Sequence, residues 1–134
     1  MYFERKLERI PVGGQELPII IDMYVLEEIQ KKYGTLNFFE NKLKGIKEIP
    51  NANGDKPKMV RTEMDIGVLN FVLPLMVREG CEIEEIKLEM TNKDIVRNIG
   101  ISHVQLQKIV CNEFDYCFEM QKKENPSRRM KENN

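Results

Sequence analysis

The stretch Leu17–Gly34, LPIIIDMYVLEEIQKKYG, decides the fold because it joins a strand directly to a helix. Its first residues are apolar and β-branched, as in a short buried strand. Asp22 can then cap a helix, since its carboxylate can accept a hydrogen bond from a free amide in the first turn. Gly34 ends the helix, where a left-handed residue is favoured. One apolar stripe follows the helix at three- and four-residue spacing, formed by Met23, Leu26, Ile29 and Tyr33.

A tight hairpin is expected just before this helix. The extended runs Lys6–Val12 and Glu16–Ile21 flank the pair Gly13-Gly14, and two glycines between extended runs favour a two-residue turn. This turn places Ile10 opposite Leu17. A two-stranded ribbon is only marginally stable by itself, so the hairpin must pack on helices.

Two more helices are expected in the middle of the chain. The first, Leu36–Lys44, is capped by Thr35 and directs Leu36, Phe39 and Leu43 inward, with Phe38 off that stripe. The second spans Glu63–Glu79, opens with a capping-box-like pair of Thr62 and Asp65, and ends at Gly80. It is apolar on nearly all sides, which is typical of the buried centre of a domain.

The segment between these two helices allows two interpretations. Pro50, Asn53-Gly54 and Pro57 favour a long mobile connection. Alternatively, Asn53-Gly54 turns a small hairpin between Ile46–Ile49 and Met59–Val60.

Two helices are expected near the C-terminus. Thr91 with Asp94 caps Asn92–Ile99, and Ser102 with Gln105 opens a long helix from His103 to about Lys123. The sequence therefore predicts an α+β fold, mostly helical, with an N-terminal β-hairpin packed on about five helices. We expect one domain over residues 1–124 and a disordered polar tail over residues 125–134.

Composition narrows the class of protein. The 134 residues include 21 basic and 22 acidic ones, and a net charge of −1 gives no general attraction to nucleic acid or to an anionic membrane. Three cysteines without a CxxC pair fit a reducing compartment, and the N-terminus does not resemble a signal peptide. We expect a cytoplasmic protein of a bacterial host cell, without a membrane partner.

No catalytic or metal-binding pattern stands out. His103 is the single histidine, and its spacing from the cysteines does not match a metal site. The acidic residues of 82–89 lack the glycine-anchored loop of a calcium site, so a solvated linker is the better interpretation. Phosphate-binding and nucleophile motifs do not occur. We therefore expect no cofactor, no metal and no enzymatic activity.

Asp94–Val110, DIVRNIGISHVQLQKIV, looks like a DNA-binding helix-turn-helix. Its second helix would present His103, Gln105, Gln107 and Lys108 to bases. However, the helix does not stop after a few turns, and the chain lacks the basic excess that holds phosphates. A plain helix–glycine–helix corner is the favoured interpretation, and a small DNA-binding regulator is the alternative.

The order of parts resembles the tail assembly chaperones of long-tailed bacteriophages, defective prophages and tail-like bacteriocins. The similar stretch is chiefly RIPVGGQELPIIIDMYVLEEIQKKYG followed by TLNFFENKLKG, Arg9–Gly45. Those chaperones also carry a strand entering a helix with the LEE pattern, then a buried helix, here DIGVLNFVLPLMVREG, Asp65–Gly80, and C-terminal helices after an acidic linker.

The resemblance implies a non-catalytic assembly factor that binds the tape-measure protein and tail-tube subunits. Phe38, Phe39 and Met120 are candidate partner-binding residues, because aromatic and methionine side chains give large adaptable contacts. Ordinary core is the favoured interpretation for Phe39. An uncovered hairpin edge would also allow a homo-oligomer. A structural tail-completion protein is a further alternative.

Overall fold

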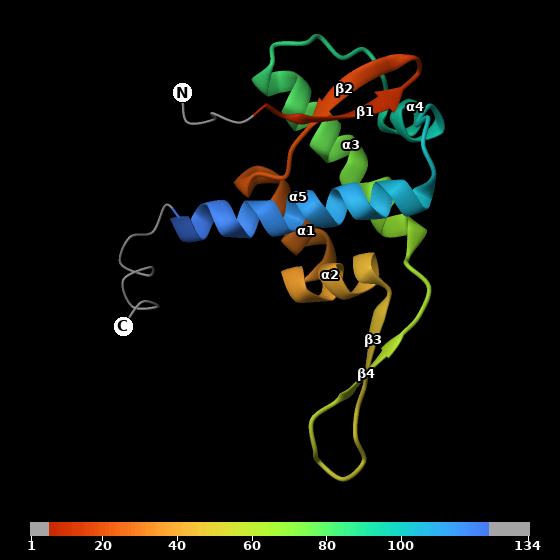
Figure 1. Cartoon of the computed structure of the whole chain (residues 1–134), viewed down its shortest axis with the longest axis vertical. Coiled ribbons are helices and arrows are strands. Elements are labelled where there is room, and N and C mark those ends of the chain that lie inside the picture. Colours follow the sequence, from red (N-terminus) through yellow and green to blue (C-terminus); the bar gives the residue numbers. More distant parts are fainter. Residues whose placement is uncertain (1–5, 124–134) are drawn as a thin grey trace.

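The computed structural model describes residues 6–123 and confirms the expected α+β, mostly helical class (Figure 1). The predicted tail, residues 125–134, lies outside the described residues. In chain order the elements are β1 (Glu8–Val12), β2 (Gln15–Ile19), α1 (Met23–Tyr33), α2 (Leu36–Lys44), β3 (Ile46–Ile49), β4 (Lys58–Arg61), α3 (Ile66–Ile83), α4 (Asn92–Arg97) and α5 (His103–Lys123).

The N-terminal hairpin forms in the predicted register, with Ile10 opposite Leu17. Gly13 and Gly14 make the turn with φ values of 58° and 81°, which favour glycine. Ile10, Leu17 and Ile19 are buried against the helices. The hairpin therefore gains from helix packing the stability that two strands lack alone.

The outer edge of β1 is covered at its turn end, where the sequence allowed an open edge. Val12 forms an isolated antiparallel bridge with Ile99. The Gly13 amide donates to the Asn98 carbonyl at 2.8 Å, and the Gly100 amide donates to the Pro11 carbonyl at 2.9 Å. The link between α4 and α5 thus occupies the position in which a strand of another chain would pair with β1.

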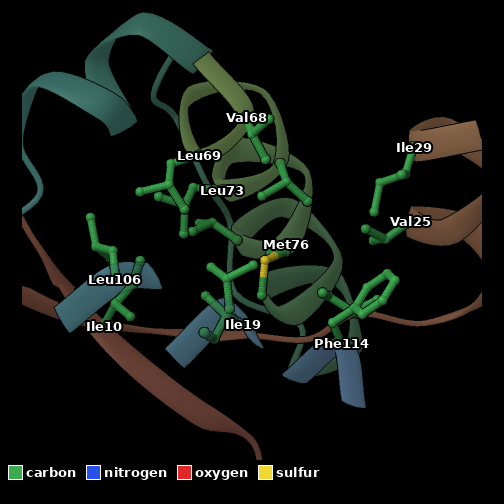
Figure 2. Close-up of a cluster of buried hydrophobic side chains, with 14 of the residues drawn as sticks. Ile10, Ile19, Val25, Ile29, Val68, Leu69, Leu73, Met76, Leu106 and Phe114 are labelled. Carbon is green, nitrogen blue, oxygen red and sulfur yellow. The ribbon is translucent and has the colours of Figure 1, made fainter. Parts of the chain in front are cut away.

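Helix α3 is the buried centre of the domain, as the sequence predicts. It packs against β2 and against α1, α2, α4 and α5. Figure 2 shows side chains of the hairpin, α1 and α5 meeting around Leu73 and Met76, which are fully buried. Gly80 lets the backbones of α3 and β2 come close together, because a Cβ there would lie 2.2 Å from the Pro18 carbonyl oxygen.

The predicted bounds of α3 are wrong at both ends. Thr62 belongs to the base of the second hairpin, where its amide donates to the Gly45 carbonyl at 2.8 Å. Asp65 is therefore the N-cap, and its side chain accepts from the Gly67 amide at 2.9 Å. At the other end, Gly80 does not stop the helix, which continues to Ile83.

Helices α1 and α2 have the predicted bounds, but the buried face of α1 is rotated. Asp22 accepts a hydrogen bond from the Val25 amide at 3.0 Å, as expected of the cap. Val25 is fully buried, whereas Met23, assigned to the inner stripe from the sequence, is 66% exposed. Val25, Leu26 and Ile29 form the buried face instead.

The C-terminal helices follow their predicted caps. Thr91 and Asp94 form a reciprocal capping box, but α4 ends at Arg97 because Ile99 is drawn into its bridge with β1. The Gln105 amide donates to the Ser102 hydroxyl at 3.2 Å and opens α5. The buried face of α5 contains Leu106, Val110, Phe114 and Cys117.

The segment after α2 is a hairpin, so the second interpretation of its sequence is the correct one. Strands β3 and β4 pair antiparallel, with Ile46 opposite Arg61 and Ile49 opposite Lys58. The hairpin extends away from the helices as an arm, at the bottom of Figure 1. We call Ile46–Arg61 the β3–β4 arm.

Candidate functional site

The Phe38 ring on α2 is a half-exposed apolar side chain beside the arm. Thr35 caps this helix by accepting from the Phe38 amide at 3.0 Å, and this cap fixes which residues face outward. Phe38 is 50% exposed, whereas Phe39 is fully buried and packs against the rings of Tyr33 and Phe114, each with a centroid separation of 5.5 Å. Of these two candidate partner-binding residues, only Phe38 is on the surface.

A groove separates Phe38 from the β3–β4 arm. It encloses about 540 Å³. Its corner is Gly45, with φ of 71°, where a Cβ would lie 2.6 Å from the Thr62 carbonyl oxygen. The residues that line this α2–arm groove are Phe38, Asn41, Lys42, Gly45, Ile46, Lys47, Glu48, Thr62, Glu63 and Asp65.

The polar groups of the groove are close to its aromatic wall. Lys42 places its Nζ 4.9 Å from the centroid of the Phe38 ring and 3.4 Å from Oδ2 of Asp65. The ring of Tyr33 lies outside the groove, 6.5 Å from the Phe38 ring between centroids, and burial and the charge of Asp65 raise the pKa of its hydroxyl. An aromatic ring bordered by a lysine and carboxylates suits side-chain recognition, because it offers apolar contact together with hydrogen bonds.

Met120, the third candidate partner-binding residue, lies on α5, but its side chain is outside the described part of the structure. Phe118, two residues earlier, is 39% exposed and stacks edge-on against Phe114 at a centroid separation of 4.9 Å. Of the candidate residues with described side chains, Phe39 is buried and Phe38 is exposed, so these two do not share a surface. Phe38 and the groove remain the site with described geometry.

Of the four candidate DNA-reading residues, two make hydrogen bonds within the domain. His103 and Lys108 are exposed on α5. Gln107 instead donates from Nε2 to the Leu43 carbonyl at the end of α2, at 2.9 Å. Gln105 uses its Oε1 to accept from the Ser102 amide at 3.2 Å. The side chains of Gln105 and Gln107 thus make hydrogen bonds within the domain, which weakens the helix-turn-helix alternative.

A carboxyl pair at the start of α1 escaped the sequence analysis. Its members, Asp22 and Glu79, lie far apart in the chain and meet only through the packing of α1 on α3. A hydrogen bond with Asp22, partial burial, and the charges of Asp22 and Glu82 raise the pKa of the Glu79 carboxyl to about 8. Spacing along the sequence gives no signal for such a pair. The pair links the cap of α1 to the last turns of α3.

The remaining features of residues 6–123 concern metal-binding groups, thiols and membrane-spanning helices. No group of three or more histidine, cysteine, aspartate or glutamate side chains there could hold a metal ion. Burial raises the pKa of the Cys81 and Cys111 thiols, and no disulfide joins the cysteines of this part of the chain. None of the described helices is both long and apolar enough to cross a membrane.

Comparisons of the chain with models of protein families, with curated proteins and with solved structures found no match.

Proposed function

We propose that this protein is a non-catalytic tail assembly chaperone that binds a tape-measure protein, tail-tube subunits or both during assembly of a phage-type tail. The proposal combines the resemblance of Arg9–Gly45 and Asp65–Gly80 to that family with a surface suited to protein contact. A tail-completion protein would share these features and differs in remaining in the finished particle.

The observation that supports the proposal most directly is the exposed Phe38 ring beside the α2–arm groove. A half-exposed aromatic side chain at the edge of a groove is a typical anchor for a partner. Lys42, which lies over the ring, can move to admit a partner side chain, because its ion pair with Asp65 is exposed to solvent. An amphipathic helix of the client would place one apolar residue against Phe38.

Co-purification with a matched pair of variants tests this function. The tagged protein is expressed with the products of neighbouring genes, and the lysate is treated with nuclease before capture. Phe38→Glu is compared with Tyr24→Glu, because both residues are in the first turn of a helix and are 50% and 51% exposed. Glutamate suits the first turn of a helix, so Phe38→Glu should keep the parent melting temperature. Tyr24→Glu adds a charge near Glu79 and Glu82 and should lower the melting temperature slightly, so it also controls for a small loss of stability.

We expect the parent and Tyr24→Glu to capture a long helical protein that is insoluble alone, and Phe38→Glu to lose most of it. Equal capture by both variants would remove Phe38 from the client surface. Capture of a defined duplex that is lost at raised salt would instead favour the DNA-binding regulator.

A further inference from the structure

The β3–β4 arm has two strand edges, and the structure shows which backbone groups point away from it. The Thr62 amide donates to the Gly45 carbonyl at 2.8 Å, so these two residues form a hydrogen-bonded pair at the base of the ladder. Hydrogen-bonded and non-hydrogen-bonded pairs alternate along an antiparallel ladder. The next pair in the register, Ile46 with Arg61, is therefore directed outward.

The same alternation assigns the rest of the arm. Lys47 and Val60 bond to each other across the ladder, whereas Glu48 and Met59 direct their amides and carbonyls outward. Within residues 6–123 no third strand pairs with β3 or β4. Strand β3 packs beside α2, but β4 packs chiefly on β3, so the edge of β4 is the more accessible one.

We propose that β4 pairs antiparallel with β4 of a second copy, so that two arms join in a four-stranded sheet. Met59 of each copy bonds to Arg61 of the other, and Val60 faces Val60 across the twofold axis. This contact is isologous, because the same surface serves both copies. A four-stranded sheet also exceeds the minimum of about three strands that independent stability needs, which a hairpin alone does not reach.

Charge and the flanking residues select the β4 edge over the β3 edge. Self-pairing of β3 about Lys47 would oppose two lysines, and self-pairing about Glu48 would oppose two glutamates. Pairing about Ile49 would place Pro50, which has no amide hydrogen, opposite Glu48, and pairing about Ile46 would place the end of α2 opposite Glu48. Like charges directly opposite each other destabilise a sheet. The β4 contact about Val60 instead opposes two valines, and β-branched pairs of this kind stabilise strands.

The sequence of β4 also selects the register. Pairing about Arg61 would place two guanidinium groups opposite each other. Pairing about Met59 would place Pro57 opposite Arg61, and proline has no amide hydrogen to donate. Pairing about Lys58 would oppose two lysines and place Pro57 opposite Met59. Of the registers centred on a β4 residue, only the one centred on Val60 avoids these costs. Because the edge is short, the contact is small, and association should depend on concentration.

Proline substitutions test pairing at the outer edge of β4 without removing a hydrogen bond between β3 and β4. Met59→Pro removes an amide that points outward and makes no bond to β3. Glu48→Pro is the matched control, because Glu48 is the register partner of Met59 and its amide also points outward. Sedimentation velocity over a range of concentrations then gives the mass of each variant.

We expect the parent and Glu48→Pro to shift toward the dimer mass as concentration rises, and Met59→Pro to remain a monomer. A parent that is monomeric at every concentration overturns the proposal. So does a dimer that persists in Met59→Pro and is lost in Glu48→Pro, since β3 would then be the paired edge.

Cross-linking tests the register. Residues opposite each other in a non-hydrogen-bonded pair have Cα atoms about 4.5 Å apart, which fits a disulfide. Val60→Cys should therefore form a covalent dimer under mild oxidation, whereas Lys47→Cys on the other edge should not. The parent controls for its own cysteines, of which Cys81 and Cys117 are buried. Equal cross-linking of both variants would refute the β4 register.

Discussion

Gly80→Ala adds one methyl group where α3 comes closest to β2. The new carbon would lie 2.2 Å from the Pro18 carbonyl oxygen and 2.9 Å from the Ile19 amide nitrogen, and ordinary contact begins at 3.4 Å. Both obstacles are backbone atoms, so no side chain can rotate away. Helix and strand would have to separate by about 1 Å, which is a severe case of overpacking.

The expected cost follows from two opposing terms. Alanine in place of glycine inside a helix stabilises by up to about 1 kcal/mol. Overpacking a core costs about 1–3 kcal/mol and sometimes more, and here the separation would also break the hydrogen bond from the Ile20 amide to the Met76 carbonyl. We expect Gly80→Ala to lower the free energy of unfolding by about 3 kcal/mol, a large share of the ~5–15 kcal/mol of a typical domain.

Urea denaturation followed by circular dichroism measures this change through the midpoint, provided the slope is unchanged. Gly67→Ala is the control, because Gly67 lies in the exposed first turn of the same helix and a Cβ there meets only the Asp65 carboxylate, at 3.1 Å. It should change stability by less than about 1 kcal/mol. A Gly80→Ala variant as stable as the parent would show that α3 and β2 are not in such close contact.

Two further predictions concern the carboxyl pair and the phenylalanines. Because the pKa of Glu79 is about 8 in the folded state, above its ordinary 4.5, the folded protein holds a proton that the unfolded chain releases, and stability should fall as pH rises from about 4.5 to 8. Glu79→Gln keeps a hydrogen-bond donor for Asp22 but cannot ionise, so it should flatten the plot of melting temperature against pH in this range. An unchanged slope would mean that another group causes the pH dependence. Phe39→Ala should cost about 3–5 kcal/mol in urea unfolding, and Phe38→Ala less than about 1 kcal/mol; similar losses would contradict their opposite orientations.

Local chemistry made much of the fold predictable. Gly13-Gly14 set the hairpin register, and the caps at Asp22 and Thr35 set the start of α1 and α2. These signals act over a few residues, so the sequence contains them in full. The outward orientation of Phe38 follows from the same helical spacing.

The errors arise where distant segments compete for the same groups. Thr62 could cap a helix, but its backbone is held in the arm by Gly45, and the helix begins later. Gly80 resembles a helix stop, yet it serves the contact with Pro18. Gln107 reads as a solvent-facing residue until α2 brings the Leu43 carbonyl to it. None of these partners is near its residue in sequence.

The bridge between Val12 and Ile99 has a consequence for synthesis on the ribosome. The first hairpin emerges early, but the residues that cover its outer strand are translated only after α3 and α4. Throughout that interval the nascent chain carries an uncovered strand edge with which a neighbouring chain on the same polysome can pair. A stop codon placed before the Ile99 codon would release a chain in which that edge is never covered.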